Sequence, residues 1–136
     1  MAAMSDTQSL LFANDLFYRC FAARDMKGLE EIWANSPSIS CTHPGWNPVI
    51  GRVAVLESFR SILLGPRPPD LRYMAPQGII LGDSGYVLCH EALEGGYLVA
   101  TNVFIREGRL WRLHHHHAGP GGKPPETADS PALTMN

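Results

Sequence analysis

The sequence from Gly85 to His117 constrains the fold most, because it has the pattern of three consecutive β-strands and ends in four histidines. Two runs rich in β-branched and aromatic residues, 86–93 and 97–105, flank Glu94-Gly95-Gly96. The glycine pair supplies the positive φ angles that a two-residue hairpin turn requires. A further hairpin leads into a last strand at residues 110–117. We therefore expect an antiparallel meander here.

Three helices are expected before this meander. Each has apolar residues at helical spacing, which is typical of a helix with one buried side. The first follows a capping-box pattern formed by a Ser and a Gln three residues later, and the second follows an Asp that is suited to cap it. The helices are expected to begin after Ser5, Asp25 and Gly51.

Two short strands, 71–75 and 77–81, are expected between the third helix and the meander, separated by Pro76. Helices followed by antiparallel strands predict an α+β fold, with three N-terminal helices packed on one face of a curved sheet. We assign residues 1–117 to a single domain. Residues 118–136 are rich in Gly and Pro, and we expect them to form a disordered tail.

Composition excludes several classes of partner. The net charge is -2 and no cluster of Lys or Arg is present, so nucleic acid is not an expected partner. The sequence has no signal-peptide pattern and no apolar run long enough to cross a membrane, so we expect a cytoplasmic protein without membrane contact. The three cysteines, Cys20, Cys41 and Cys89, lack metal-site or disulfide spacing.

Side-chain alternation in the first hairpin predicts two faces. With Gly95-Gly96 as the turn, Glu91 pairs with Ala100 and Cys89 with Asn102 on one face. The opposite face is also largely apolar. Because helices cover one face, the other needs a second cover, and we expect a homodimer through this outer sheet face.

The second hairpin leaves two alternatives. A bulged three-residue loop at Arg106-Glu107-Gly108 places Arg112, His114 and His116 beside Asn102. A two-residue Glu107-Gly108 turn instead places Trp111, Leu113, His115 and His117 there. We favour the bulged form because it uses the glycine at the position that needs a positive φ.

The four histidines do not by themselves predict a metal site. Successive side chains of a strand point to opposite faces, so at most two can reach one ion. The sequence also lacks the spacings typical of zinc sites on helices. We therefore expect no metal and no cofactor.

Glu91 and Asn102 interrupt apolar strands on the same predicted face. A buried carboxylate needs a hydrogen-bond partner or a raised pKa, so the pair indicates a polar patch inside a pocket. Two interpretations remain open: a structural hydrogen-bond network, or general acid–base chemistry with a nearby histidine. His43 and Trp46, in a loop broken by two prolines and a glycine, are expected at the pocket mouth.

A family resemblance rests on a set of motifs. In chain order these are Leu-Glu-Glu-Ile-Trp, Cys-Thr-His-Pro-Gly-Trp, Gly-Arg-Val-Ala-Val-Leu-Glu-Ser, Ala-Thr-Asn-Val-Phe and Trp-Arg-Leu-His-His-His-His-Ala. Over residues 8–118 the chain resembles the SnoaL-like, ketosteroid isomerase-like branch of the nuclear transport factor 2-like superfamily. The resemblance implies a cone-shaped fold with a pocket inside the cone and commonly a dimer interface on the outer sheet face.

The resemblance also sets expectations about the site. A ketosteroid isomerase would carry a Tyr and paired Asp residues in the cavity, whereas the strands here carry Glu91, Asn102 and a histidine. Kinase association domains carry arginines on the last strands, where this chain has Glu91, Asn102 and Ala118, so anion binding is not expected.

We therefore expect a pocket for a small organic molecule, with an isomerisation, cyclisation or dehydration that needs no cofactor. The expected catalytic residues are Glu91 and His116. The alternative is a non-catalytic dimerisation or ligand-sensing module. The expected substrate-binding residues are Trp33, His43, Trp46, Phe59, Cys89, Asn102, Phe104 and His114.

Overall fold

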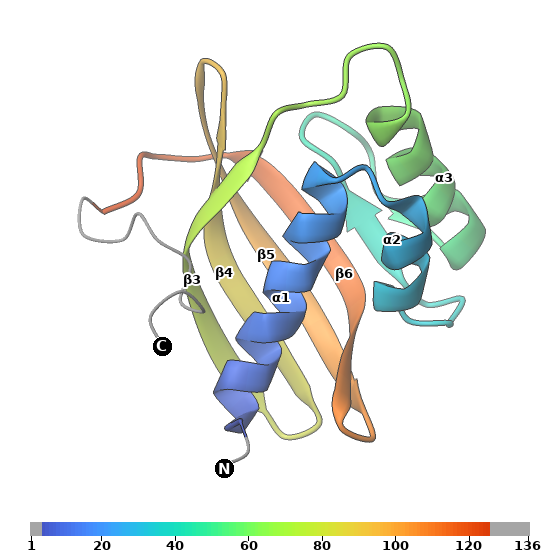
Figure 1. The fold of residues 1–136 in the computed structure, drawn as a ribbon, viewed down its shortest axis with the longest axis vertical. Coiled ribbons are helices and arrows are strands. Elements are labelled where there is room, and N and C mark those ends of the chain that lie inside the picture. The colour runs from blue at the N-terminus through green and yellow to red at the C-terminus, as the bar shows by residue number, and fades with distance from the viewer. Residues whose placement is uncertain (1–3, 126–136) are drawn as a thin grey trace.

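The computed structural model describes residues 4–125, and the rest of the predicted tail, residues 126–136, lies outside the described residues. Three helices pack on one curved six-stranded sheet that does not close into a barrel, which confirms the predicted α+β fold (Figure 1). The elements are α1 (Asp6–Ala22), α2 (Met26–Ile32), β1 (Ser40–Thr42), β2 (Val49–Ile50), α3 (Arg52–Leu63), β3 (Arg72–Leu81), β4 (Ser84–Leu93), β5 (Gly96–Glu107) and β6 (Leu110–Pro120).

The sheet has the strand order β2-β1-β6-β5-β4-β3. All neighbouring pairs are antiparallel except β1 and β6, which run parallel. Helix α1 lies along one face of the long strands, and α2 and α3 lie beside β6 and the short strands (Figure 1). The inner face of the meander is therefore covered by α1, and this places the polar residues of β4–β6 beneath that helix.

Helix α1 begins where the sequence predicts. The Ser5 side chain accepts a hydrogen bond from the Gln8 backbone amide, and the Gln8 side chain accepts one from the Ser5 amide. Leu10 of this helix lies against Gly85, where an added Cβ would come within 3.1 Å of a Leu10 methyl group. The missing side chain thus lets α1 approach the sheet closely.

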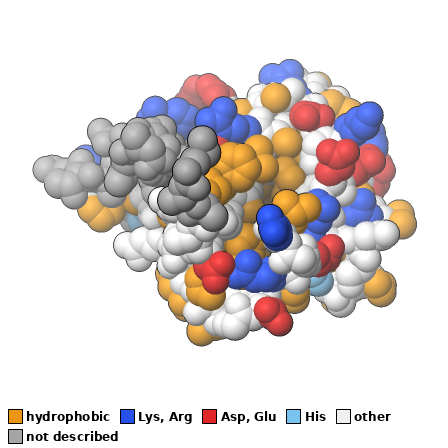
Figure 2. All heavy atoms as spheres, turned by 60° about the horizontal axis from the view of Figure 1, so that its bottom comes forward, with side chains coloured by type: hydrophobic (Ala, Val, Ile, Leu, Met, Phe, Trp, Pro, Cys, Tyr) orange, Lys and Arg blue, Asp and Glu red, His pale blue; other side chains and the backbone are white. Residues whose placement is uncertain are grey.

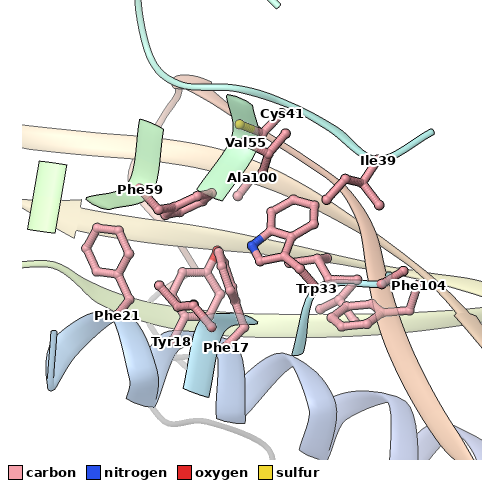
Figure 3. Close-up of a cluster of buried hydrophobic side chains, with 14 of the residues drawn as sticks. Phe17, Tyr18, Phe21, Trp33, Ile39, Cys41, Val55, Phe59, Ala100 and Phe104 are labelled. Atoms are coloured by element: carbon pink, nitrogen blue, oxygen red, sulfur yellow. The ribbon is translucent and has the colours of Figure 1, made fainter. Parts of the chain in front are cut away.

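The core is aromatic where α1 meets the other elements. Phe17 makes edge contacts with Trp33 and Phe59, with ring centroids 6.4 and 5.9 Å apart (Figure 3). Phe59 and Trp33 are 0% and 1% exposed. Such a cluster combines a large buried apolar area with directional ring packing, so it fixes the relative positions of α1, α2 and α3.

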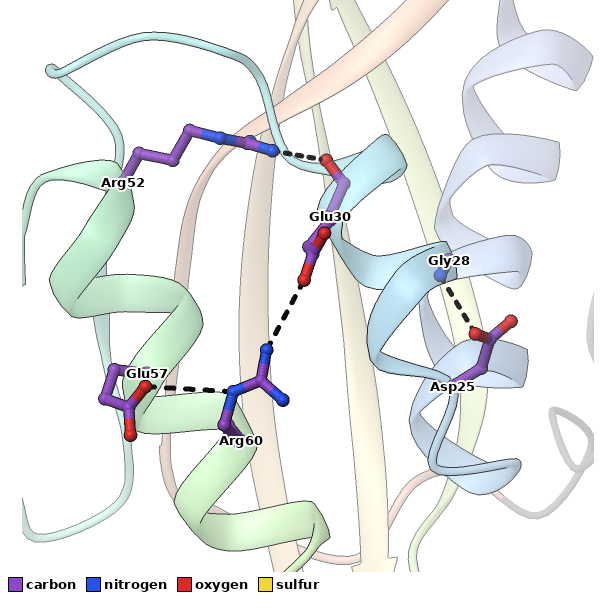
Figure 4. Close-up of polar contacts among 6 residues, drawn as sticks. All are labelled: Asp25, Gly28, Glu30, Arg52, Glu57 and Arg60. Atoms are coloured by element: carbon purple, nitrogen blue, oxygen red, sulfur yellow. Dashed lines mark hydrogen bonds and ion pairs between the residues drawn. The ribbon is translucent and has the colours of Figure 1, made fainter.

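Polar contacts hold α3 against α2 (Figure 4). Arg52, at the start of α3, donates to the backbone carbonyls of Glu30, Trp33 and Ala34. These carbonyls lie at the end of α2, where helical partners are missing. Arg52 thus satisfies acceptors that would otherwise be unpaired, and fixes the loop before β1.

The first hairpin corrects the predicted register. Leu93 pairs with Gly96, so the turn is Glu94-Gly95 rather than Gly95-Gly96, and Glu91 lies opposite Leu98. Gly95 has the positive φ, 92°. The shift amounts to two positions along the partner strand, so each side chain stays on its predicted face.

The second hairpin differs from both predicted alternatives. Glu107 pairs with Leu110 across a Gly108-Arg109 turn, and the irregularity lies inside the strands, between Val103 and Phe104 on β5. Opposite this point, β6 holds an extra residue at His114. As a result Trp111 and Leu113 are buried before the bulge, and His116 is buried after it.

Two further boundaries differ from prediction. The segments on either side of Pro76 form one strand, β3, in which the register shifts between Met74 and Gln77. A bulge accommodates the proline because no ladder hydrogen bond is needed there. At the other end β6 continues to Pro120, beyond the predicted end of the domain, and the Gly121 amide donates to the Tyr97 carbonyl.

Charges of both signs are mixed on the face of the molecule that Figure 2 shows. Basic and acidic side chains are interspersed with hydrophobic ones on the face in Figure 2. This agrees with the small net charge of -2. None of the helices in residues 4–125 is long and apolar enough to cross a membrane.

Candidate functional site

A mainly apolar cavity of about 230 Å³ lies between α1, the loop after β1, the segment after α3 and the inner face of the sheet. Its polar wall contains Glu91, His116 and His43, which are 2%, 5% and 4% exposed. Trp46 lies at the mouth and is 45% exposed. The full lining consists of Phe17, Tyr18, Phe21, His43, Pro44, Trp46, Ile62, Pro69, Leu71, Glu91, Leu93, Leu98 and His116.

Four of the ten predicted site residues therefore line this cavity: Glu91, His116, His43 and Trp46. The structure brings them together from β4, β6 and the loop after β1. The remaining six lie behind the wall or away from it.

Glu91 is held by Tyr18 of α1. The Tyr18 hydroxyl donates to Glu91 Oε2 at 2.5 Å, and Oε1 has no hydrogen bond from a described residue. Burial raises the pKa of Glu91 to about 7, although the Tyr18 hydrogen bond acts in the opposite direction. The carboxyl group thus changes charge near neutral pH, as a general base requires.

Asn102 connects α1 to His116. Its amide nitrogen donates to Asn14 Oδ1 at 2.8 Å and to the Tyr18 hydroxyl at 3.2 Å. Its amide oxygen accepts from His116 Nδ1 at 2.5 Å. Asn102 is 0% exposed and its amide is fully engaged, so it positions Tyr18 and His116 rather than lining the cavity.

Both cavity histidines are neutral at physiological pH. Burial lowers the pKa of His116 to about 3, with a further contribution from His43, His115 and His117. Burial lowers the pKa of His43 to about 4. Each ring therefore carries one N–H and one free lone pair.

His43 is oriented by α3. Its Nε2 lies 2.9 Å from Ser58 Oγ, and the Ser58 hydroxyl donates to the Val55 carbonyl at 2.6 Å. The imidazole also packs against Phe59 with ring centroids 4.8 Å apart, and against Trp46 at the same distance. The ring is thus held between a buried serine and two aromatic side chains.

The other predicted site residues do not line the cavity. Trp33 and Phe59 belong to the aromatic core, and Phe104 is 0% exposed in the same core. Cys89 lies 3.4 Å from the Tyr18 hydroxyl, and burial raises the pKa of its thiol to about 12, so it is not a thiolate nucleophile. His114 is at the β6 bulge, half-buried and outside the cavity lining.

Sequence reasoning missed two polar residues on α1. Tyr18 and Asn14 lie one helical turn apart on the buried side of the helix, and both bond to Asn102. Tyr18 also stacks on Tyr73 with ring centroids 4.6 Å apart, and Tyr73 donates to Asp15. The available signal was a pair of hydrogen-bonding groups, spaced by four, inside an otherwise apolar stripe.

Within residues 4–125 no group of three or more His, Cys, Asp and Glu side chains has the geometry of a metal site. In the final strand His116 faces the cavity, whereas His115 bonds to Ser40 and packs near His117, with ring centroids 6.2 Å apart. The four histidines therefore do not converge on one point.

A family model described as a SnoaL-like domain matches residues 11–120. Among curated proteins, the F-box protein SKIP8 of Arabidopsis thaliana is 25% identical over 114 residues, which cover 82% of this chain and 49% of that protein. The chain thus spans about half the length of this curated relative.

Solved structures give the same fold. A candidate dehydratase of the NTF2-like family from Streptomyces avermitilis is 29% identical, with 85% of this chain and 96% of that chain covered and a TM-score of 0.77. A candidate calcium/calmodulin-dependent protein kinase type II association domain from Thiobacillus denitrificans is 32% identical, with coverages of 80% and 92% and a TM-score of 0.73.

Proposed function

The chain belongs to the SnoaL-like domain family, and from this premise we propose that its cavity binds a small organic molecule and catalyses a proton transfer without a cofactor. The reaction class is isomerisation, cyclisation or dehydration. One observation carries the proposal: Glu91 is a buried carboxyl group with a pKa near 7 on the wall of an apolar cavity. The similarity to a candidate dehydratase supports the same reaction class.

In this proposal Glu91 is the base. Its free oxygen takes a proton from the ligand, while the Tyr18 hydrogen bond keeps the carboxyl group oriented. The mainly apolar lining keeps the Glu91 carboxylate poorly solvated, which raises its basicity. His116, held by Asn102, is the second hydrogen-bond acceptor of the wall.

The proposed role of Glu91 is testable before a natural substrate is known. The probe 5-nitrobenzisoxazole loses its C3 proton to a base while its N–O bond breaks, which gives a coloured cyanophenolate. We expect the wild type to accelerate this reaction about 100-fold more than Glu91→Gln, with a rate that rises as the pH passes 7. Glu94→Gln, in the exposed turn, is the matched control. Equal rates for wild type and Glu91→Gln would exclude Glu91 as the base.

We also propose that a second copy of the chain packs on the outer sheet face. Leu88, Val99 and Ile105 on that face are 39%, 42% and 36% exposed. The 32% identical relative is described as an association domain, which supports assembly through this fold. If the cavity proved to be inactive, this face would be the main functional surface of a non-catalytic module.

A dimer through this face predicts that a charged substitution on the face separates the two subunits. Ile105→Glu is expected to convert the protein to a monomer in light scattering coupled to size exclusion, because a buried carboxylate without a partner costs more than the contact contributes. Ile50→Glu changes the same residue type at a site that is 71% exposed on β2, and it should leave the mass unchanged. A monomeric wild type, or a dimeric Ile105→Glu variant, contradicts this interface.

A further inference from the structure

The buried polar side chains of the cavity wall present hydrogen-bond acceptors, and we infer that the cavity selects ligands that donate hydrogen bonds, namely small, mainly apolar alcohols or amines. The inference rests on the proposed function, since it names the ligand class of the same cavity. It follows from the hydrogen bonds of the cavity wall, because the buried donor groups of the wall already have partners within the protein.

His116 presents a lone pair. Asn102 donates its amide hydrogens to Asn14 and Tyr18, so its oxygen is the atom that faces His116. An amide oxygen can only accept, and the proton of the neutral imidazole therefore sits on Nδ1. Nε2 is left as an acceptor, with no hydrogen-bond partner among the described residues.

His43 presents a lone pair for a similar reason. The single hydroxyl proton of Ser58 goes to the Val55 carbonyl, so Ser58 Oγ accepts from His43 Nε2. The proton of the neutral ring is consequently on Nε2, and Nδ1 is an acceptor. In both histidines the N–H group thus donates to another side chain of the protein, and the other ring nitrogen is left as an acceptor.

Glu91 completes the set. Its ionised carboxylate can accept hydrogen bonds at both oxygens, and Oε2 already accepts one from the Tyr18 hydroxyl. The described lining contains no Lys or Arg. The remaining side-chain N–H of the lining is the indole of Trp46, which lies at the exposed mouth.

This arrangement discriminates between ligands of equal size. A carbonyl or carboxylate placed against the wall would lose its hydrogen bonds to water and gain none, and buried polar groups without partners are costly. A hydroxyl or ammonium group would bond to Glu91 Oε1 or to a ring nitrogen. Selection therefore depends on the direction of the hydrogen bond more than on shape.

Four benzyl compounds of similar size test the inference at pH 8, where Glu91 is ionised. We expect benzyl alcohol and benzylamine to bind at least about tenfold more tightly than benzaldehyde and benzoate in NMR titrations of the full-length protein. The ¹⁵N shifts of His116 should show the proton on Nδ1. Glu91→Gln is the informative variant, because its side-chain oxygen keeps the Tyr18 bond and its NH₂ group turns a donor toward the cavity. The preference for the alcohol over the aldehyde should then shrink.

The outcomes separate the two proposals. Binding of benzaldehyde or benzoate as tightly as the alcohol, or a proton on His116 Nε2, would overturn the donor selectivity and leave small-molecule binding in place. If none of the four compounds shifts resonances of cavity residues, the proposed ligand cavity and the selectivity are both overturned.

Discussion

Glu91→Gln is expected to make the protein more stable than the wild type above pH 7. The pKa of Glu91 is raised from 4.5 to about 7 in the folded state. Between these pH values the folded protein binds more protons than the unfolded chain. The contribution of Glu91 to stability is therefore fully present below pH 4.5 and is lost as the pH rises through 7. The loss amounts to about 3 kcal/mol, and Gln removes it while keeping an acceptor for Tyr18.

Urea unfolding of both proteins between pH 4.5 and 9 measures this difference. The two buried histidines act in the other direction: their pKa values lie below 6.5 when folded, so their contribution is present above pH 6.5 and is lost in acid. Because both proteins carry these histidines, the difference between the two curves isolates Glu91. Glu94→Gln should run parallel to the wild type. A Glu91→Gln curve that is also parallel would refute the raised pKa.

Asn102→Leu is expected to lower the free energy of unfolding by about 3 kcal/mol at pH 7. Leucine fills a similar volume but leaves the buried His116 Nδ1–H and Asn14 Oδ1 without their partners. An unsatisfied buried donor or acceptor carries its full desolvation cost. His116 should also lose its single tautomer, because nothing then fixes the proton on Nδ1.

Thr101→Val is the matched control for this variant, because Thr101 is the neighbour of Asn102 on the same strand and faces the outer side. We expect it to change stability by less than about 1 kcal/mol. Denaturant unfolding measures both variants, and ¹⁵N shifts report the His116 tautomer. The network would be energetically unimportant if Asn102→Leu cost no more than Thr101→Val.

The faces of the sheet were predictable although the register was not. The first hairpin turns one residue earlier than predicted, which moves every pairing by two positions. Side chains alternate with a period of two, so Glu91 and Asn102 remain on the inner face. The exact turn depends on which residue adopts the positive φ, and Gly95 and Gly96 are equally able to do so.

The position of the bulge in β6 could not be read from the sequence. The predicted alternatives placed the irregularity in the turn, whereas the structure places it at His114 inside the strand. The position of a bulge depends on the twist and curvature of the whole sheet, and local residue preferences do not specify these. A bulge at either position puts His116 on the inner face, as predicted and observed. His114 was predicted to lie in the cavity, but it is itself the extra residue of the bulge and does not line the cavity.

The role of Tyr18 could not be predicted from its neighbours in the sequence. It lies in a helical stripe with Leu10, Phe17 and Phe21, and an aromatic residue in such a stripe usually serves as core. Its partners, Glu91 and Asn102, are 73 and 84 residues away in the chain. Only the packing of α1 on the sheet brings these hydroxyl, carboxyl and amide groups together.

A crystal structure of the full-length wild type grown with benzyl alcohol tests the central claim most directly, namely that the cavity beneath α1 binds a small molecule against Glu91. We expect a ligand enclosed by Phe17, Trp46 and Leu98, with its hydroxyl within hydrogen-bond distance of Glu91 or His116. A ligand found on the outer sheet face alone, or an empty cavity at saturating benzyl alcohol, would contradict it.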